Sequence, residues 1–169
     1  MYDLETLRFM DKNENIIFIG TSGVGKTHLA VAIGMAAAKK RISTYYITFN
    51  DLINQLMKAN SENRADIKIK YFCKYKLLII DEIGYLPITK EGAYLFFQLI
   101  NKRYEKKSTI LTTNQIFSKW PEVFGDSVVT AAIVDRLVHH SHIIKINGKS
   151  YRIKDRNVVL KKSVDKEYE

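Results

Sequence analysis

The sequence contains few of the residues that define several common protein classes. Its 169 residues include one cysteine, Cys73, and two prolines. A single cysteine excludes a disulfide framework within the chain and is typical of proteins in a reducing compartment. No apolar run approaches the roughly 18 residues of a membrane span, and the first residues lack the basic and apolar regions of a secretion signal. We therefore expect a soluble, cytoplasmic protein without a membrane partner.

Acidic residues are also scarce, since 27 lysines and arginines outnumber 18 acids and leave a net charge of +9. Such an excess favours a polyanionic partner. Much of it lies in segment 64–76, where Tyr71, Phe72 and Tyr75 stand between basic residues. This mixture suits a surface that binds a nucleic-acid backbone and stacks on its bases. A solvated helix face whose aromatic rings point into the core would give the same pattern, so both interpretations stay open.

Apolar runs typical of buried strands alternate with segments of helical periodicity, which predicts an α/β fold with a mostly parallel sheet. Strands are expected at Ile16–Ile19, Thr44–Thr48, Leu77–Ile80, Thr109–Thr112 and His142–Ile146. Helices are expected over 26–39, 90–104 and 126–138. A further helix should follow Asn50 and Asp51, which have the side chains of N-terminal caps. The run Leu77–Ile80 is apolar at every residue, so its strand should lie inside the sheet.

The most informative motif directly follows the first expected strand. The pattern G-x-x-x-x-G-K-[ST] of a phosphate-binding loop is matched by Gly20, Thr21, Ser22, Gly23, Val24, Gly25, Lys26 and Thr27. In such a loop the backbone N–H groups point at the phosphates, the lysine reaches the β- and γ-phosphates, and the threonine hydroxyl ligates Mg²⁺. A chance glycine-rich turn would not require Lys26 and Thr27 at this spacing. The sequence therefore predicts ATP and Mg²⁺ as cofactors.

Two carboxylates follow the apolar strand Leu77–Ile80, at the edge of the sheet where open α/β folds bind ligands. Asp81 should hold Mg²⁺ through a water molecule, and Glu82 is placed to polarise a water for in-line attack on the γ-phosphate. The second carboxylate favours hydrolysis over the phosphoryl transfer of a small-molecule kinase. An Asp-Glu pair alone would be a solvated strand end, but the phosphate loop makes a hydrolytic site the better interpretation.

Two further residues are candidates for the same site. Asn114 follows the expected strand 109–112, and it, or Thr113 in its place, is positioned to hydrogen-bond the attacking water or the γ-phosphate. Alone, an asparagine at a strand end more often forms a turn. Arg136 lies near the end of the last expected helix. It acts either as a finger on the γ-phosphate of a neighbouring subunit or as a surface partner of Asp135.

The histidines give weaker signals. His139, His140 and His142 invite a metal hypothesis, which we do not favour because the sequence offers no cysteine or acidic partner at ligand spacing. His28 directly follows Thr27, and because of this position we include it among the expected nucleotide-binding residues. We interpret it as a histidine of a helix face or of the core rather than as a catalyst.

Taken in order, these pieces resemble the AAA+ ATPases, and more closely the IstB-like transposition helper ATPases, which are similar to DnaC-type helicase loaders. The resemblance covers nearly the whole chain and is carried by segments 20–30, 81–87, 124–126, 135–141 and 150–152. The strings Gly-Tyr-Leu-Pro and Asp-Arg-Leu…His-His-Ser are far more specific than the phosphate loop.

The resemblance implies an AAA+ P-loop domain over residues 1–155, with a five-stranded sheet in the order 5-1-4-3-2 and a C-terminal lid that is absent or truncated. The polar, basic tail 156–169 is expected to be partly disordered. Asn114 then aligns the lytic water, and Arg136 acts across the interface of a homo-oligomer that shares its ATP sites. Contacts with DNA map to the basic region 64–70, and Arg152 is the candidate for the sensing arginine of the lid.

The leading functional hypothesis is an ATPase that assembles on DNA and regulates or recruits a transposase. A replicative helicase loader of DnaC type, whose partner is a DnaB-type helicase, would use the same chemistry. A nucleotide-gated DNA-binding module with negligible hydrolysis is the alternative from another class.

Overall fold

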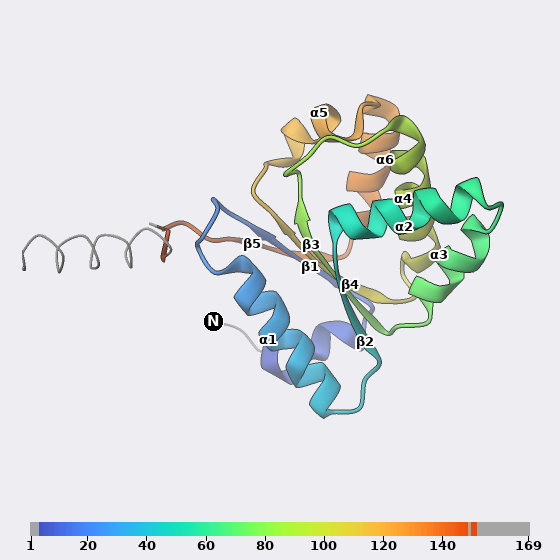
Figure 1. Ribbon diagram of the computed structural model, residues 1–169. Coiled ribbons are helices and arrows are strands. Elements are labelled where there is room, and N and C mark those ends of the chain that lie inside the picture. Colours follow the sequence, from blue (N-terminus) through green and yellow to red (C-terminus); the bar gives the residue numbers. More distant parts are fainter. Residues whose placement is uncertain (1–3, 149, 152–169) are drawn as a thin grey trace, which may run out of the picture.

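Five parallel strands form one sheet at the centre of the computed structural model, which describes residues 4–148 and 150–151 (Figure 1). The strands are β1 (Asn15–Ile19), β2 (Thr44–Thr48), β3 (Leu77–Ile83), β4 (Ser108–Thr113) and β5 (Ser141–Lys145). Their order is β2-β3-β4-β1-β5, which is the predicted order read from the other edge. The predicted tail and Arg152 lie outside the described residues.

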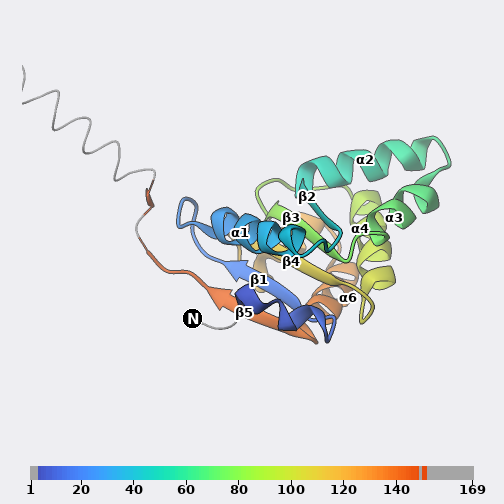
Figure 2. The same cartoon turned by 90° about the horizontal axis from the view of Figure 1, so that it is seen from below.

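The helices cover the two faces of the sheet unequally (Figures 1 and 2). They are α1 (Lys26–Lys39), α2 (Phe49–Ser61), α3 (Ala65–Cys73), α4 (Lys90–Arg103), α5 (Trp120–Phe124) and α6 (Ser127–Val138). Helix α1 packs on one face together with the short 3-10 turns Leu4–Thr6 and Arg8–Met10, and the other helices cover the opposite face. Within the described residues, no helix is long and apolar enough to cross a bilayer.

The alternation of strand side chains explains the two cores. In β1, Ile16 and Phe18 pack toward α1, whereas Ile17 and Ile19 pack toward the helices of the other face. Residues 77–80 of β3 alternate in the same way and are all buried, because β3 lies between β2 and β4. The interior position predicted for this apolar run is confirmed.

The cap of α2 differs from the prediction. The helix begins at Phe49, and Thr48 is its N-terminal cap, so the expected caps Asn50 and Asp51 lie inside the first turn. The Thr48 hydroxyl oxygen accepts a hydrogen bond from the Asp51 backbone N–H at 3.2 Å and donates to the Asp51 carboxylate at 2.8 Å. Threonine is itself a good cap, and the last residue of β2 therefore also starts the helix.

A buried arginine joins three segments of the larger core. Arg103 is 2% exposed, and its guanidinium donates to the carbonyl oxygens of Phe72 at 3.0 Å, Tyr75 at 2.9 Å and Ser108 at 2.6 Å. Its Nε donates to the Thr109 hydroxyl at 3.1 Å. Burial lowers the pKa of Arg103 to about 10, which still leaves the group charged at neutral pH. The charge is thus held by acceptors from the end of α3, the following turn and β4.

Candidate functional site

The phosphate-binding loop connects β1 to α1 and ends in a left-handed glycine. Gly25 is the N-terminal cap of α1 with a φ of 96°, a conformation that residues with a side chain adopt only under strain. The 14-residue helix that follows points its N-terminus toward the loop. Because the dipole of a helix is positive at this end, the loop and α1 together favour a bound phosphate.

Lys26 is held inside the loop. Its side chain is buried, with 5% exposure, and its ammonium donates to the carbonyl oxygens of Gly20 at 2.7 Å and Thr21 at 2.8 Å. Val24 is also buried and packs inward from the loop. The ammonium is therefore kept next to the position where the loop receives phosphates.

Strand alternation brings the expected magnesium residues together. Ile79 packs toward α1, so Asp81, two residues later on β3, lies on the same face. Thr27, in the first turn of α1, donates to Asp81 Oδ1 at 3.0 Å. Hydroxyl and carboxylate oxygens are the hard ligands that Mg²⁺ prefers, and Asp81 is only 2% exposed. The residues present thus fit a magnesium ion.

Two hydroxyl groups that sequence analysis did not identify hold Asp81 in place. Tyr46 on β2 donates to Asp81 Oδ2 at 2.7 Å, and the Thr112 hydroxyl on β4 donates to Oδ1. Burial, and next the hydrogen bond to Asp81, raises the pKa of Tyr46, so its hydroxyl remains protonated and can donate. The relevant signal was the register of the sheet, in which Tyr46 lies opposite Ile79 on the α1 face.

Glu82 occupies a distorted position at the end of β3. Its φ is 65°, in the left-handed region, and the register of β3 against β4 shifts between Ile80 and Ile83. The Glu82 backbone N–H donates to the Thr112 hydroxyl oxygen at 2.9 Å. This irregularity directs Asp81 into the structure and leaves the neighbouring Glu82 exposed. The two carboxylates therefore have separate environments, as a metal-binding group and a base require.

The phosphate loop, α1 and the end of β3 all contribute to the lining of a pocket of about 490 Å³. It is lined by Ser22, Gly23, Gly25, Lys26, Thr27, His28, Val31, Ala32, Met35, Glu82, Tyr85 and Tyr151. His28 is exposed on the first turn of α1, which agrees with the interpretation as a helix-face histidine and excludes a core position. The volume and the mixed lining suit a small-molecule ligand.

Asn114 lies at the carboxyl end of β4, between the neighbouring strands β1 and β3. It is exposed, and its Oδ1 lies 3.4 Å from the position that a Cβ on Gly84 would take. Thr113 is fully buried, and its hydroxyl oxygen accepts the Gln115 backbone N–H at 3.1 Å. The exposed Asn114 is therefore the candidate that remains for binding the attacking water. Thr113 instead stabilises the turn that follows β4.

Arg136 lies on the face of the sheet opposite α1. Its Nε donates to Asn101 Oδ1 at 2.7 Å, another guanidinium nitrogen donates to the Ala132 carbonyl at 3.1 Å, and the group stacks 4.9 Å from the centre of the Phe97 ring. The alternative partner Asp135 is not among these contacts. Arg136 is also not among the described residues that line the pocket.

The basic segment forms α3 and part of a second pocket, of about 480 Å³, between α2 and α3. Phe72 is fully buried, as the core interpretation predicts. Tyr71 is only half-buried and lines this pocket, and the ammonium groups of Lys68 and Lys74 lie 5.0 and 4.9 Å from its ring centre. Lys58 and Arg64 also line the pocket. An aromatic ring among cations therefore remains at the surface.

Residues 1–159 match a protein family described as IstB-like ATP binding protein. A protein named as an ATP-binding protein of insertion sequence IS232, from Bacillus thuringiensis subsp. berliner, is 60% identical over 153 residues, which cover 90% of this chain and 61% of the relative. Its counterpart from IS21 of Pseudomonas aeruginosa is 47% identical over 154 residues, with coverages of 91% and 58%. This chain thus spans about three fifths of the length of these relatives.

Solved structures share the fold. The DnaC helicase loader superposes with a TM-score of 0.68 at 27% sequence identity, over 86% of this chain and 82% of that one. AMPPCP-bound DnaA from Aquifex aeolicus has a TM-score of 0.71 over 94% of this chain and 50% of that one, and at 21% identity it shows the fold alone. With the observed strand order, these likenesses confirm the predicted P-loop AAA+ core.

Proposed function

This chain belongs to the IstB-like ATP-binding family, and from that premise we propose that it hydrolyses ATP with Mg²⁺, assembles on DNA and regulates or recruits a transposase. The observation that carries the hydrolytic part is the 3.0 Å hydrogen bond from Thr27 to Asp81, with Glu82 on the same pocket. This contact joins the phosphate loop to the carboxylates that follow β3.

Each residue of the site has a separate role in the proposed hydrolysis. Thr27 and, through a water molecule, Asp81 would hold Mg²⁺, which would neutralise charge on the β- and γ-phosphates. Lys26 exchanges the carbonyls of Gly20 and Thr21 for phosphate oxygens. Glu82 accepts a proton from a water molecule that Asn114 orients. As the water oxygen bonds to the γ-phosphorus, the bond to the bridging oxygen breaks, and ADP leaves with that electron pair.

Assembly on DNA is supported by charge and by the pocket between α2 and α3. The chain carries a net charge of +9, and Lys58, Arg64 and Lys68 line the same pocket as the half-buried Tyr71. Cations neutralise phosphates, and an aromatic ring offers a face on which bases stack. The relatives are named for insertion sequences, which favours a transposase as the protein partner.

Replacing Lys26 by alanine should weaken ATP binding about 100-fold, because two charge-assisted hydrogen bonds to phosphate are lost. A titration with a fluorescent ATP analogue measures the affinity. Lys39→Ala removes the same charge from the exposed end of the same helix and should leave the affinity unchanged. An unaltered affinity in Lys26→Ala would contradict the assignment of the loop.

The proposed function as a whole is tested by measuring ATP hydrolysis with and without duplex DNA, and DNA binding at several salt concentrations. Duplex DNA should stimulate hydrolysis. Arg64→Glu with Lys68→Glu should weaken DNA binding at least about tenfold and reduce the salt slope by about 2, because two phosphate contacts are lost. Lys39→Glu, on the other face of the sheet, is the control. It should change neither the DNA affinity nor its salt dependence appreciably.

The likeness to the DnaC loader favours a helicase loader as the second candidate function. A preference for single-stranded DNA, together with capture of a DnaB-type helicase, would support that candidate over a transposition helper. Nucleotide-dependent DNA binding without turnover would instead support the nucleotide-gated module.

A further inference from the structure

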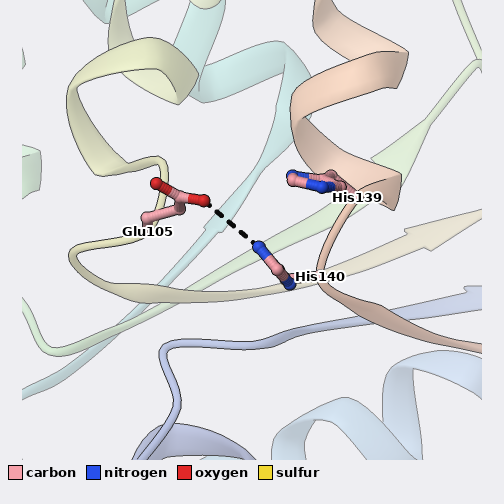
Figure 3. Close-up of side chains that lie close together, drawn as sticks. All are labelled: Glu105, His139 and His140. Carbon is pink, nitrogen blue, oxygen red and sulfur yellow. Dashed lines mark hydrogen bonds and ion pairs between the residues drawn. The ribbon is translucent and has the colours of Figure 1, made fainter.

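Three side chains with metal-binding atoms lie close together (Figure 3). They lie at the end of the sheet opposite the phosphate loop, which follows the carboxyl end of β1. Glu105 precedes β4, His139 is the C-terminal cap of α6, and His140 precedes β5, so all three lie at the amino ends of parallel strands. Their potential ligand atoms lie within 4.8 Å of one another. Nothing in the nucleotide chemistry requires this cluster.

The structure corrects the reason given against a metal at these histidines. That reason was the lack of an acidic partner at ligand spacing, but the fold places Glu105 beside His140, 35 residues away in the chain. His140 Nε2 lies 3.1 Å from the Glu105 carboxylate. His142 lies outside the cluster and instead contacts the carboxylate of Glu14 at 2.7 Å.

We propose that Glu105, His139 and His140 bind one Zn²⁺ ion, or a similar first-row transition-metal ion. Two imidazoles and one carboxylate form a ligand set that zinc uses in proteins, with water in the fourth position. Ligand atoms about 2.0–2.1 Å from a tetrahedral ion stand about 3.3 Å apart. The separation of 3.1 Å between His140 and Glu105 fits this value, and a ligand atom of His139 lies within 4.8 Å of both.

Neighbouring groups hold two of the three ligands in position. His139 Nδ1 and the Tyr104 hydroxyl form a hydrogen bond. With Nδ1–H donating to the Tyr104 oxygen, the lone pair of His139 lies on Nε2, the nitrogen that we assign to the ion. Glu105 has a φ of 57°, in the left-handed region, and its carbonyl accepts a hydrogen bond from the Asn13 side chain at 3.0 Å.

The ion would join the turn after α4 to the end of α6. Arg136 lies three residues before His139 on α6 and contacts Asn101 on α4, so it stands within the same pair of helices. Metal binding should therefore stiffen the corner of the domain that carries this arginine. The metal site itself does not rest on the proposed ATPase function, since none of its ligands lines the nucleotide pocket.

Calorimetric titration of the tag-free protein with Zn²⁺ tests the proposal. Millimolar Mg²⁺ in the buffer occupies the oxygen ligands of Thr27 and Asp81 without competing for imidazole. We expect one Zn²⁺ per chain, at micromolar affinity or tighter. Glu105→Gln and His140→Gln should each weaken binding about 10- to 100-fold. His142→Gln is the matched control and should bind zinc as the unchanged protein does.

Ring signals in the NMR spectrum identify the ligands independently. The chain has four histidines, and Zn²⁺ should shift the ring signals of His139 and His140 but not those of His28 and His142. All three variants alter exposed side chains, so circular dichroism in EDTA should show the same fold for each. The proposal is overturned if no zinc binds, if His142→Gln weakens binding as much as His140→Gln, or if the shifts fall on His28.

Discussion

Replacing Glu82 by glutamine should lower the rate of ATP hydrolysis about 10³-fold while the affinity for ATP stays within about twofold. Glutamine keeps the size and shape of the side chain but cannot accept the proton of the attacking water. The left-handed backbone at this position is equally strained in both proteins, so the comparison isolates the proton acceptor. Phosphate release under saturating Mg²⁺ and ATP measures the rate, and a fluorescent analogue measures binding.

The control for this variant is Glu122→Gln, which makes the same change in an exposed residue of α5. It should hydrolyse ATP at the rate of the unchanged protein. If Glu82→Gln retains its turnover, another group accepts the proton. If it instead loses ATP binding, the bulge at the end of β3 shapes the pocket rather than supplying a base.

Replacing Arg136 by alanine should also reduce hydrolysis about 10³-fold, because a finger arginine stabilises the charge of the transition state. The arginine is held by Asn101, Ala132 and Phe97 on the face of the sheet that α1 does not cover. Because it does not line the nucleotide pocket of its own chain, we propose that it acts on the γ-phosphate of another subunit. The rate is again measured by phosphate release, and Arg41→Ala, on the exposed turn after α1, is the control and should retain activity.

Mixing two inactive variants distinguishes this role from a structural one. Subunits with Arg136→Ala retain an intact loop, and subunits with Lys26→Ala retain an intact arginine. In random assemblies of equal amounts, about a quarter of the interfaces combine both intact halves, so about a quarter of the activity should return. A mixture that remains as inactive as its components would place the action of Arg136 within its own subunit.

The parts of the fold predicted best are those encoded by neighbouring residues. The strand Thr44–Thr48 was predicted with its observed bounds, and the apolar run Leu77–Ile80 identified an interior strand because four successive side chains need burial on both faces. The predicted cap of α2 was wrong because Thr48 was taken only as the end of a strand, whereas the same residue also caps the helix. The order of the strands in the sheet was predicted from the family resemblance, since no local pattern encodes which strands pair.

In the site, too, residues that are neighbours in the chain were predicted, and residues that only the fold brings together were missed. Eight consecutive residues define the phosphate loop, and Asp81 with Glu82 follows directly from the end of a strand. The hydroxyl groups of Tyr46 and Thr112 were missed because each reaches Asp81 from a different strand, and only the register across the sheet brings them there. Glu105 was missed beside His140 because the contact forms between two turns that are distant in the chain.

The buried Arg103 has a consequence for how the domain folds. Its guanidinium is satisfied only when the end of α3, the turn before β3 and the start of β4 are all in place. Detaching α3 alone would remove the Phe72 carbonyl from these acceptors, and a buried donor left without its partner costs about 1–3 kcal/mol. The arginine therefore disfavours partly unfolded states and makes α3, which carries the basic surface, unfold together with the sheet rather than fray from it.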